Sequence, residues 1–577
     1  MKLTISRSKN SEHFYISQSY VNNHGKSTTK TFRKLGSLSE LSVKLNTDRD
    51  GVIAWAKEQV RIETEKYKKE QESISVPFHP NQFINMNERR SFNCGYLFLQ
   101  SLCTLLHFHN ICRNIKSRHD FDYPLQSILS DLIYSRILHP SSKKSSFDFA
   151  HSLLEQPKYD LHHIYRALSV LANESDYIQS EVYKNSHFIR SRNTKVLYYD
   201  CTNYYFEIED DDELRKYGKS KEHRPNPIVT MGLFMDTDGV PLAFDLYPGN
   251  LNEQKTLKPL EQKILRDFDC SEFIYCSDAG LGSQSNKLFN DIQGRSYVIA
   301  QSLKKLKQED REIALNPKQF KKLGSNEWID ISTLDETDSA AYEAMYYKVV
   351  PIESKKLSET MIVTYSPKYK AYQAGIRQKQ LNRAQQMISN DGKFKKNRRN
   401  PNDPSRFIKK TSFTERGEIA DKEIYEIDPS VIEKEARYDG FYAVITDIEG
   451  SVEEIIKINK RRWQIEECFR IMKTEFDARP VYLRREDRIK AHFLICFLSL
   501  LVYRLLEIEL DKEYTAEEII STLREMNVCL LDGYGYIPTY TRTTLTNKLH
   551  ELFGFHTDTQ IIKKSKMRNI IHQTKQI

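Results

Sequence analysis

Residues 461–473, RRWQIEECFRIMK, decide how the fold is interpreted. On a helix with about 100° between successive residues, Arg462, Glu466 and Lys473 fall within about 40° of one another, so a carboxylate and two cations share one row. Glu467 points to another side, about 140° from Arg462. Apolar residues lie just beside the row, which places it at the border of a buried stripe. From this helix alone, an ion-paired surface is at least as good an interpretation as a catalytic site.

Two acidic residues upstream end predicted strands. Residues 195–200 predict a buried strand that ends on Asp200, and residues 273–276 predict a short apolar strand that leads into Asp278. Further elements of the same α/β module are predicted around them: strands at 228–235, 242–246 and 441–446, and helices at about 254–267 and 452–476.

The combination of Asp200, Asp278 and Glu466 carries more information than any one of these residues. Hard carboxylate oxygens of this kind hold two divalent cations of the Mg²⁺ type. Such ions activate a water or a 3′ hydroxyl and stabilise the leaving oxygen when a phosphodiester bond is broken. Burying three carboxylates together costs repulsion unless a metal compensates it.

The order of these segments resembles the DDE transposases of bacterial insertion sequences, in particular the group with a Tyr-x2-Arg-x3-Glu-x6-Lys signature. Arg462, Glu466 and Lys473 have the required spacing. YYDCTNYYFE, residues 198–207, resembles the segment of the first Asp, and YCSDAGLGSQSN, residues 275–286, that of the second. The resemblance spans about residues 194–480. It implies an α/β ribonuclease H-like core that is interrupted by a largely β insertion domain.

The resemblance also implies roles for individual residues. Asp200, Asp278 and Glu466 would be the catalytic triad and the ligands of two Mg²⁺ ions, with Mn²⁺ as a substitute. Arg462 and Lys473 would contact phosphates at the transposon end. Asn459 stands where the signature has Tyr. Asn retains a hydrogen-bond donor for a phosphate contact, but it has no ring to stack.

The positive charge of the chain is concentrated in one segment. Residues 366–410 contain 13 Lys and Arg against two Asp, a net charge of +11, so the rest of the chain carries −3 of the total +8. Such a run is either a solvated face or a contact to nucleic acid. The candidate DNA contacts in its centre are Lys393, Lys395, Lys396, Arg398 and Arg399.

The chain is divided into six predicted parts. They are a small β unit and charged helix (1–75), an α-helical DNA-binding domain (76–190), the first part of the catalytic core (191–303), a basic insertion domain (304–435), the second part of the core (436–512) and a C-terminal helical region (513–577). The helical block at 76–190 contains no local DNA-reading motif, so a plain scaffold is an equally good interpretation of it.

Composition narrows the class of protein further. With 29% charged and 39% hydrophobic residues, the chain is neither fully disordered nor embedded in a membrane. The start MKLTISRSKN lacks the apolar stretch of a signal peptide, and the apolar run at 493–503 is too short to span a bilayer. We therefore expect a cytoplasmic protein with no membrane partner, associated with the bacterial nucleoid by resemblance.

Nine cysteines without a C-x-x-C pair indicate reduced, mostly buried thiols. Cys103, His107, His109 and Cys112 place four candidate zinc ligands within ten residues, but they lie in an apolar helical pattern. Packed core is the favoured interpretation, because the spacing matches no usual zinc finger.

The function expected from these features is that of a transposase. It would bind the terminal inverted repeats of its insertion sequence, cleave the DNA with Mg²⁺ and transfer the strands to target DNA. Pairing of two ends implies, by resemblance, a dimer in a synaptic complex. Two alternatives stay open: a ribonuclease H-like nuclease that cuts without joining, and a DNA-binding protein that has lost catalysis.

Overall fold

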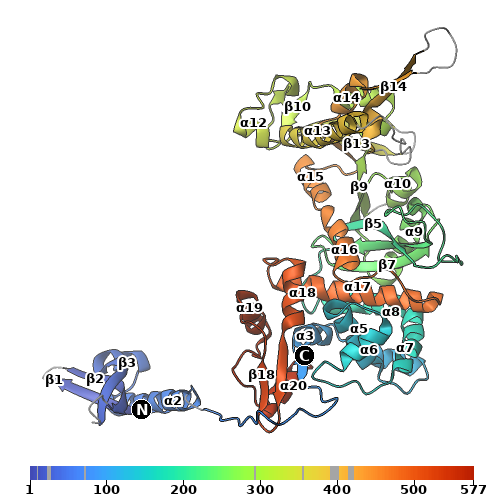
Figure 1. The fold of residues 1–577 in the computed structure, drawn as a ribbon. Helices are drawn as coiled ribbons and strands as arrows, with labels where there is room; N and C mark the ends of the chain where they lie inside the picture. The colour runs from blue at the N-terminus through green and yellow to red at the C-terminus, as the bar shows by residue number, and fades with distance from the viewer. Residues whose placement is uncertain are drawn as a thin grey trace. The chain divides into compact units, whose positions relative to one another are not determined.

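The computed structural model describes the chain except for residues 9–10, 22–26, 71–72, 292–293, 354–356, 390–401, 414–421 and 577. Its contacts separate residues 1–88 from residues 89–577. The first unit is an antiparallel sheet in the order β1-β2-β3 followed by two helices (Figure 1). Its elements are β1 (Lys2–Ser8), β2 (Ser11–Val21), β3 (Ser27–Ser37), α1 (Leu38–Leu45) and α2 (Arg49–Glu70). Phe14, Leu41, Val52 and Ala56 form its small core.

The second unit is built on a ten-stranded mixed sheet with the order β11-β10-β12-β13-β16-β9-β8-β5-β6-β7. The pairs β5–β8 and β8–β9 are parallel, and the other neighbours are antiparallel. The strands are β5 (Val196–Tyr205), β6 (Ile228–Met235), β7 (Pro241–Pro248), β8 (Phe273–Ser277), β9 (Arg295–Gln301), β10 (Phe320–Lys322), β11 (Trp328–Ile329), β12 (Tyr346–Glu353), β13 (Ser358–Tyr365) and β16 (Phe441–Thr446).

The segment expected as a largely β insertion, 304–435, is mixed. Its strands β10 to β13 extend the same sheet, because β13 pairs with the whole length of β16. The segment also contains a separate hairpin of β14 (Ile408–Phe413) and β15 (Lys422–Ile427), and the helices α11 (Gln308–Leu315), α12 (Ser339–Glu343), α13 (Pro367–Ser389) and α14 (Pro429–Ala436). The largely β prediction misses α13, whose Gln-, Ala- and Lys-rich sequence favours a helix without an apolar stripe.

Helices cover the sheet at its β7 end, where α17 (Glu486–Glu509) contacts β7 and the helices α3, α5, α7 and α8 (Figure 1). The helices of this layer are α3 (Tyr96–Leu105), α4 (Phe108–Arg118), α5 (Leu125–Leu138), α6 (Lys143–Ala150), α7 (Leu161–Asn173) and α8 (Ser175–Ser186). By length and composition α17 is apolar enough to cross a membrane, but its apolar window is entirely buried in the structure. We interpret α17 as the core helix of this layer.

The C-terminal region is not purely helical. β17 (Asn527–Leu531) and β18 (Gly535–Pro538) form a small sheet with β4 (Ser91–Asn93), beside α18 (Ala516–Glu525), α19 (Thr544–Phe553) and α20 (Lys564–Gln573). The end of the chain therefore packs against the start of the helical block. Four more helices complete the layers on the sheet: α9 (Leu257–Asp267), α10 (Gln284–Asn290), α15 (Val452–Lys460) and α16 (Trp463–Thr474).

Candidate active site

Asp200 lies in the middle of β5, which continues to Tyr205 beyond the strand end predicted at Asp200, and Asp278 follows the neighbouring strand β8. The parallel register pairs Tyr198 of β5 with Cys276 of β8, and Asp200 and Asp278 each lie two residues beyond this last pair. Asp200 is partly accessible between two fully buried neighbours on β5, and Asp278 follows the last residue of β8. The charge of Asp278 acts on Asp200, so the two carboxylates lie near each other where the pairing of β5 with β8 ends.

The two carboxylates are close enough to influence each other. Burial raises the pKa of Asp200 to about 6; the Lys221 ammonium opposes this rise, and the charge of Asp278 adds to it. Backbone N–H groups hold both side chains: Cys201 donates to Oδ1 of Asp200 at 2.7 Å, and Gly280 donates to Oδ1 of Asp278 at 2.9 Å. The two carboxylates are therefore held in position and repel each other, as expected of ligands for a cation.

The helix predicted at 452–476 is two helices, α15 and α16, which are separated at Arg461 and Arg462. The predicted row survives this break, because Arg462 retains helical dihedral angles as the N-cap of α16. Its Nη1 donates to Oε1 of Glu466 at 3.1 Å. Its positive charge partly offsets the rise that burial causes in the pKa of Asp200. The Nε of Arg462 is buried and has no hydrogen-bond partner among the described residues. Arg462 thus links the helix to the acids on the sheet and keeps one donor free.

Glu466 and Glu467 have different environments. The Glu466 side chain is 59% exposed, and its ion pair is the one with Arg462. The Oε2 of Glu467 lies 3.2 Å from Nη1 of Arg504, whose side chain is almost completely buried. Glu467 therefore belongs to the packing of α16 on α17, and Glu466 is the carboxylate that is available to solvent and ligands.

Lys473 and Asn459 lie at the two ends of this region. Lys473 lies over the Tyr204 ring and pairs with Glu222 at 3.4 Å, and burial lowers its pKa to about 8. Asn459 is on α15, where its Oδ1 accepts a hydrogen bond from the Tyr442 hydroxyl at 3.5 Å. A tyrosine ring from β16 therefore lies beside Asn459.

Sequence reasoning missed Lys221, Glu222, Tyr442 and Arg479. Lys221 and Glu222 lie in the connection between β5 and β6, which has no periodic pattern to distinguish them. Tyr442 is one residue in the ordinary alternating pattern of β16, which does not distinguish it from its neighbours. No local signal identified these residues, because their partners are distant in the sequence.

A metal ion fits the acids on the sheet. The carboxylates of Asp200 and Asp278 are hard oxygen donors with a mutual repulsion that a cation would relieve. Glu466 is not drawn in to the same point: within the described residues, the ligand atoms of the three acids do not all lie within 4.8 Å of one another. Glu466 is connected to the pair through Arg462.

The zinc alternative is not supported. In the part of the chain that the structure describes, the groups with closely spaced ligand atoms are Asp160, His162 and His163, and His550, His556 and Asp558. Cys103, His107, His109 and Cys112 form no such group. Both ring nitrogens of His550 are already hydrogen-bonded, to Thr546 and Thr557.

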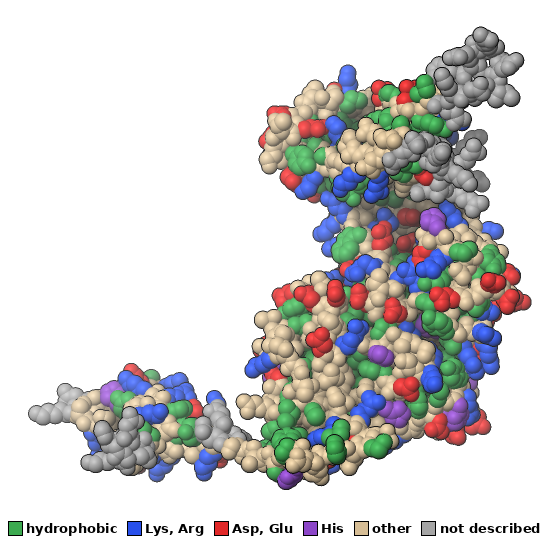
Figure 2. Space-filling model, in the orientation of Figure 1, with side chains coloured by type: hydrophobic (Ala, Val, Ile, Leu, Met, Phe, Trp, Pro, Cys, Tyr) green, Lys and Arg blue, Asp and Glu red, His purple; other side chains and the backbone are tan. Residues whose placement is uncertain are grey.

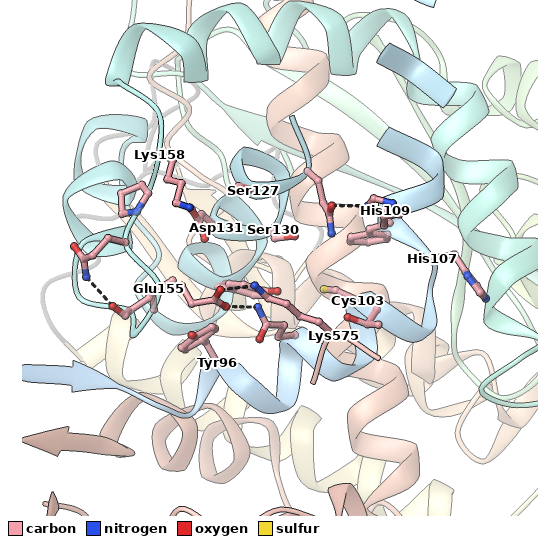
Figure 3. Close-up of a pocket in the computed structure, with 18 of the residues that line it drawn as sticks. Tyr96, Cys103, His107, His109, Ser127, Ser130, Asp131, Glu155, Lys158 and Lys575 are labelled. Atoms are coloured by element: carbon pink, nitrogen blue, oxygen red, sulfur yellow. Dashed lines mark hydrogen bonds and ion pairs between the residues drawn. The ribbon is translucent and has the colours of Figure 1, made fainter. Parts of the chain in front are cut away.

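A cavity of about 520 Å³ lies in the helical layer (Figure 3). Cys103, His107 and His109 contribute to its wall, and Lys575 from the C-terminus closes one side by pairing with Glu155. His109 contacts Gln126 at 3.0 Å. None of the predicted catalytic or DNA-contacting residues lines this cavity.

The predicted DNA contacts Lys393, Lys395, Lys396, Arg398 and Arg399 lie outside the described residues. Four other cations of the basic segment are neutralised by acids from elsewhere in the chain. The ion pairs are Lys368 with Glu343, Lys370 with Glu336, Arg377 with Asp439 and Arg406 with Glu435. On the face drawn in Figure 2, Lys and Arg side chains also gather where α15 runs beside the sheet.

Two cations of α13 make a testable contrast with these pairs. Lys379 and Arg383 have no ion pair among the described residues, whereas Lys368 and Lys370 are paired with glutamates. We predict that Lys379→Gln with Arg383→Gln lowers the slope of log K against log salt for DNA binding by up to about 2. Lys368→Gln with Lys370→Gln should change the slope less. Equal slopes for the two double variants would contradict this assignment.

The large mixed sheet, with acids and cations converging on β5, defines an α/β protein with a carboxylate-rich site. Residues 205–502, just over half of the chain, match the transposase DDE domain. The chain therefore belongs to the DDE transposase family. The match includes Asp278 and Glu466 and begins five residues after Asp200.

Two other comparisons add little. No curated protein matches the chain significantly. A cryo-EM structure of the piggyBac transposase synaptic complex with hairpin DNA is similar over 83% of this chain and 84% of that one, at 9% identity. Its TM-score of 0.35 is too low to support a conclusion.

Proposed function

We propose that this protein is the transposase of a bacterial insertion sequence. It binds the terminal inverted repeats, cleaves the DNA at the ends and joins the 3′ ends to target DNA. The observation that carries the proposal is the proximity of Asp200 on β5 to Asp278, which follows the parallel strand β8, with Arg462 and Glu466 beside them, in a chain of the DDE transposase family.

The strand order supports a ribonuclease H-like core. β5 is flanked on one side by the antiparallel β6 and β7, and on the other by the parallel β8 and β9. This is the order of a ribonuclease H-like sheet, in which the first strand is central. Residues 304–435 then interrupt the core before β16 and α16 complete it.

The proposed chemistry divides between the acids and the cations. Asp200, Asp278 and Glu466 would hold two Mg²⁺ ions, or Mn²⁺ in their place, which supply an activated water or 3′ hydroxyl and stabilise the leaving oxygen. Arg462 orients the scissile phosphate, since its buried Nε is a donor without a partner in the described structure. Lys473 contributes charge for the same strand, and Asn459 can donate to a phosphate oxygen.

The partners follow from this proposal. They are double-stranded DNA of the terminal inverted repeats and of the target, with two copies of the chain in a synaptic complex. The protein would act on the nucleoid in the bacterial cytoplasm. The buried α17 is consistent with a role that involves no membrane.

A strand-transfer assay tests the proposal. Purified protein is incubated with Mg²⁺, target plasmid and the DNA that flanks its gene, supplied uncut and with pre-cleaved ends. We expect cleavage of the first substrate and joined products from both. Cleavage without joining would favour a nuclease, and DNA binding without either reaction would favour a protein that has lost catalysis.

A further inference from the structure

Glu222 joins two cations that come from a distant part of the chain. It lies in the connection between β5 and β6, and its Oε1 is 3.4 Å from Nζ of Lys473 at the end of α16. The same oxygen forms an ion pair with Arg479, which follows α16. The side chains are largely protected from solvent, with exposed fractions of 26% for Glu222, 14% for Lys473 and 23% for Arg479.

Aromatic rings of β5 hold these cations in place. Lys473 lies over the Tyr204 ring at 5.4 Å, and Arg479 lies over the Tyr205 ring at 5.9 Å. Arg224, two residues after Glu222, covers the same Tyr205 ring at 4.5 Å. Both tyrosines are on the strand that carries Asp200. The cations are therefore positioned by the same rigid strand as the candidate catalytic acid.

The charges of this cluster do not cancel. Lys473 and Arg479 contribute two positive charges, and Glu222 contributes one negative charge. Taking two cations out of water is costly unless anionic groups compensate both of them. A guanidinium matches the oxygens of a phosphate as well as those of a carboxylate, so one site can accept either anion.

The segment around Glu222 adopts its conformation against a backbone preference. His223 has a φ of +57°, in the left-handed region that residues other than glycine seldom adopt. The ion pairs of Glu222 therefore help to hold the connection where it is. If another anion took the cations, this segment would lose that restraint.

We propose that Lys473 and Arg479 form a binding site for one DNA backbone phosphate, and that Glu222 occupies this phosphate site until DNA displaces it. The proposal deepens the proposed function, on which it rests, because it requires DNA at the surface beside Asp200. It assigns Arg479 as a further DNA contact, and Glu222 as a competitor that is built into the connection between β5 and β6.

The salt dependence of binding separates this role from a structural one. In the wild-type protein, DNA exchanges a phosphate for the Glu222 carboxylate, so this site releases few counterions. In Glu222→Gln, an anion from solution would neutralise the free cations and would be released when DNA binds. The slope of log K against log salt should then become steeper by about 1.

The experiment measures fluorescence anisotropy of a mixed-sequence DNA duplex with the full-length protein, without divalent metal, over a range of salt concentrations. Glu207→Gln is the matched control, because Glu207 is exposed, lies in the same connection and forms no ion pair in the described structure. We expect Glu222→Gln to bind several-fold more tightly than wild type at low salt with the steeper slope. Glu207→Gln should bind DNA like the wild type. Arg479→Gln should weaken DNA binding both in the wild-type protein and in Glu222→Gln.

Each outcome decides a different point. If Glu222→Gln resembles Glu207→Gln while the wild type cleaves and joins DNA, the phosphate site is wrong and the proposed function stands. If Glu222→Gln gains affinity and slope but the wild type shows no cleavage, the phosphate site stands and the proposed function fails. If neither wild type nor Glu222→Gln binds DNA, both proposals are overturned.

Discussion

Asp200→Asn and Asp278→Asn are each expected to abolish DNA cleavage and strand transfer while the protein remains folded and still binds DNA. In the proposed mechanism each carboxylate holds a metal ion that supplies several kcal/mol of transition-state stabilisation, so the rate should fall by about 10³-fold or more. The measurement is single-turnover cleavage of the flanking DNA with Mg²⁺, alongside duplex binding by anisotropy.

Asp245→Asn is the matched control for this prediction. Asp245 lies on β7 of the same sheet, and its Oδ1 accepts a hydrogen bond from the N–H of Leu246 at 2.8 Å. Asp200 accepts the equivalent bond from Cys201 at 2.7 Å. The control therefore removes a similar charge and alters a similar hydrogen bond at a distance from Asp278. If Asp200→Asn retained cleavage, Asp200 would not be a catalytic residue.

Stability gives an independent measure of the same site. Because burial raises the pKa of Asp200 to about 6, the metal-free fold favours the protonated carboxyl. Stability should fall as pH rises from about 4, the pKa of an unfolded Asp, to about 6, and should then level off. Asp200→Asn should therefore gain about 1–2 kcal/mol of unfolding free energy at pH 7.5 without metal, and little below pH 4. Urea denaturation at the two pH values measures the difference.

Local patterns in the sequence were sufficient for two of the strands near the site. β6 and β16 occupy the predicted residues 228–235 and 441–446, because a buried strand is a short apolar run between turns. The proximity of Asp200 to Asp278 follows from the parallel pairing of β5 with β8, but the strand end predicted at Asp200 was wrong, because the buried run continues and β5 extends to Tyr205. The break between α15 and α16 was not predictable, since the apolar spacing continues through Arg461 and Arg462.

The net charge of a sequence segment did not show which of its cations are free to contact DNA. Residues 366–410 carry +11, yet Lys370 is paired with Glu336, and Arg377 with Asp439, which lie outside the window. The same limit hid the cluster of Glu222, Lys473 and Arg479, because Glu222 lies about 250 residues before the two cations in the sequence. Pairs of this kind are determined by topology, and single-sequence periodicity contains no information about them.

Glu466→Gln and Glu467→Gln should have opposite effects, although the two residues are adjacent. Glu466 is exposed, and beyond its ion pair with Arg462 it contributes little to packing, so Glu466→Gln should leave the urea midpoint unchanged. If Glu466 is the third metal ligand, cleavage should fall by about 10³-fold or more. Glu467→Gln should retain cleavage within a few-fold of wild type.

The cost of Glu467→Gln should appear in stability. Arg504 is buried, and its Nη1 lies 3.2 Å from Glu467 and 2.7 Å from Glu507, so the substitution leaves this guanidinium with one carboxylate instead of two. Removing one partner of a buried charge is destabilising, and because Glu507 remains, we expect a loss of about 1–2 kcal/mol. Urea denaturation and single-turnover cleavage on both variants measure the two effects. If Glu467→Gln lost cleavage and Glu466→Gln kept it, the catalytic carboxylate would lie on the face of α16 that packs against α17, and the row of Arg462, Glu466 and Lys473 would be an ion-paired surface.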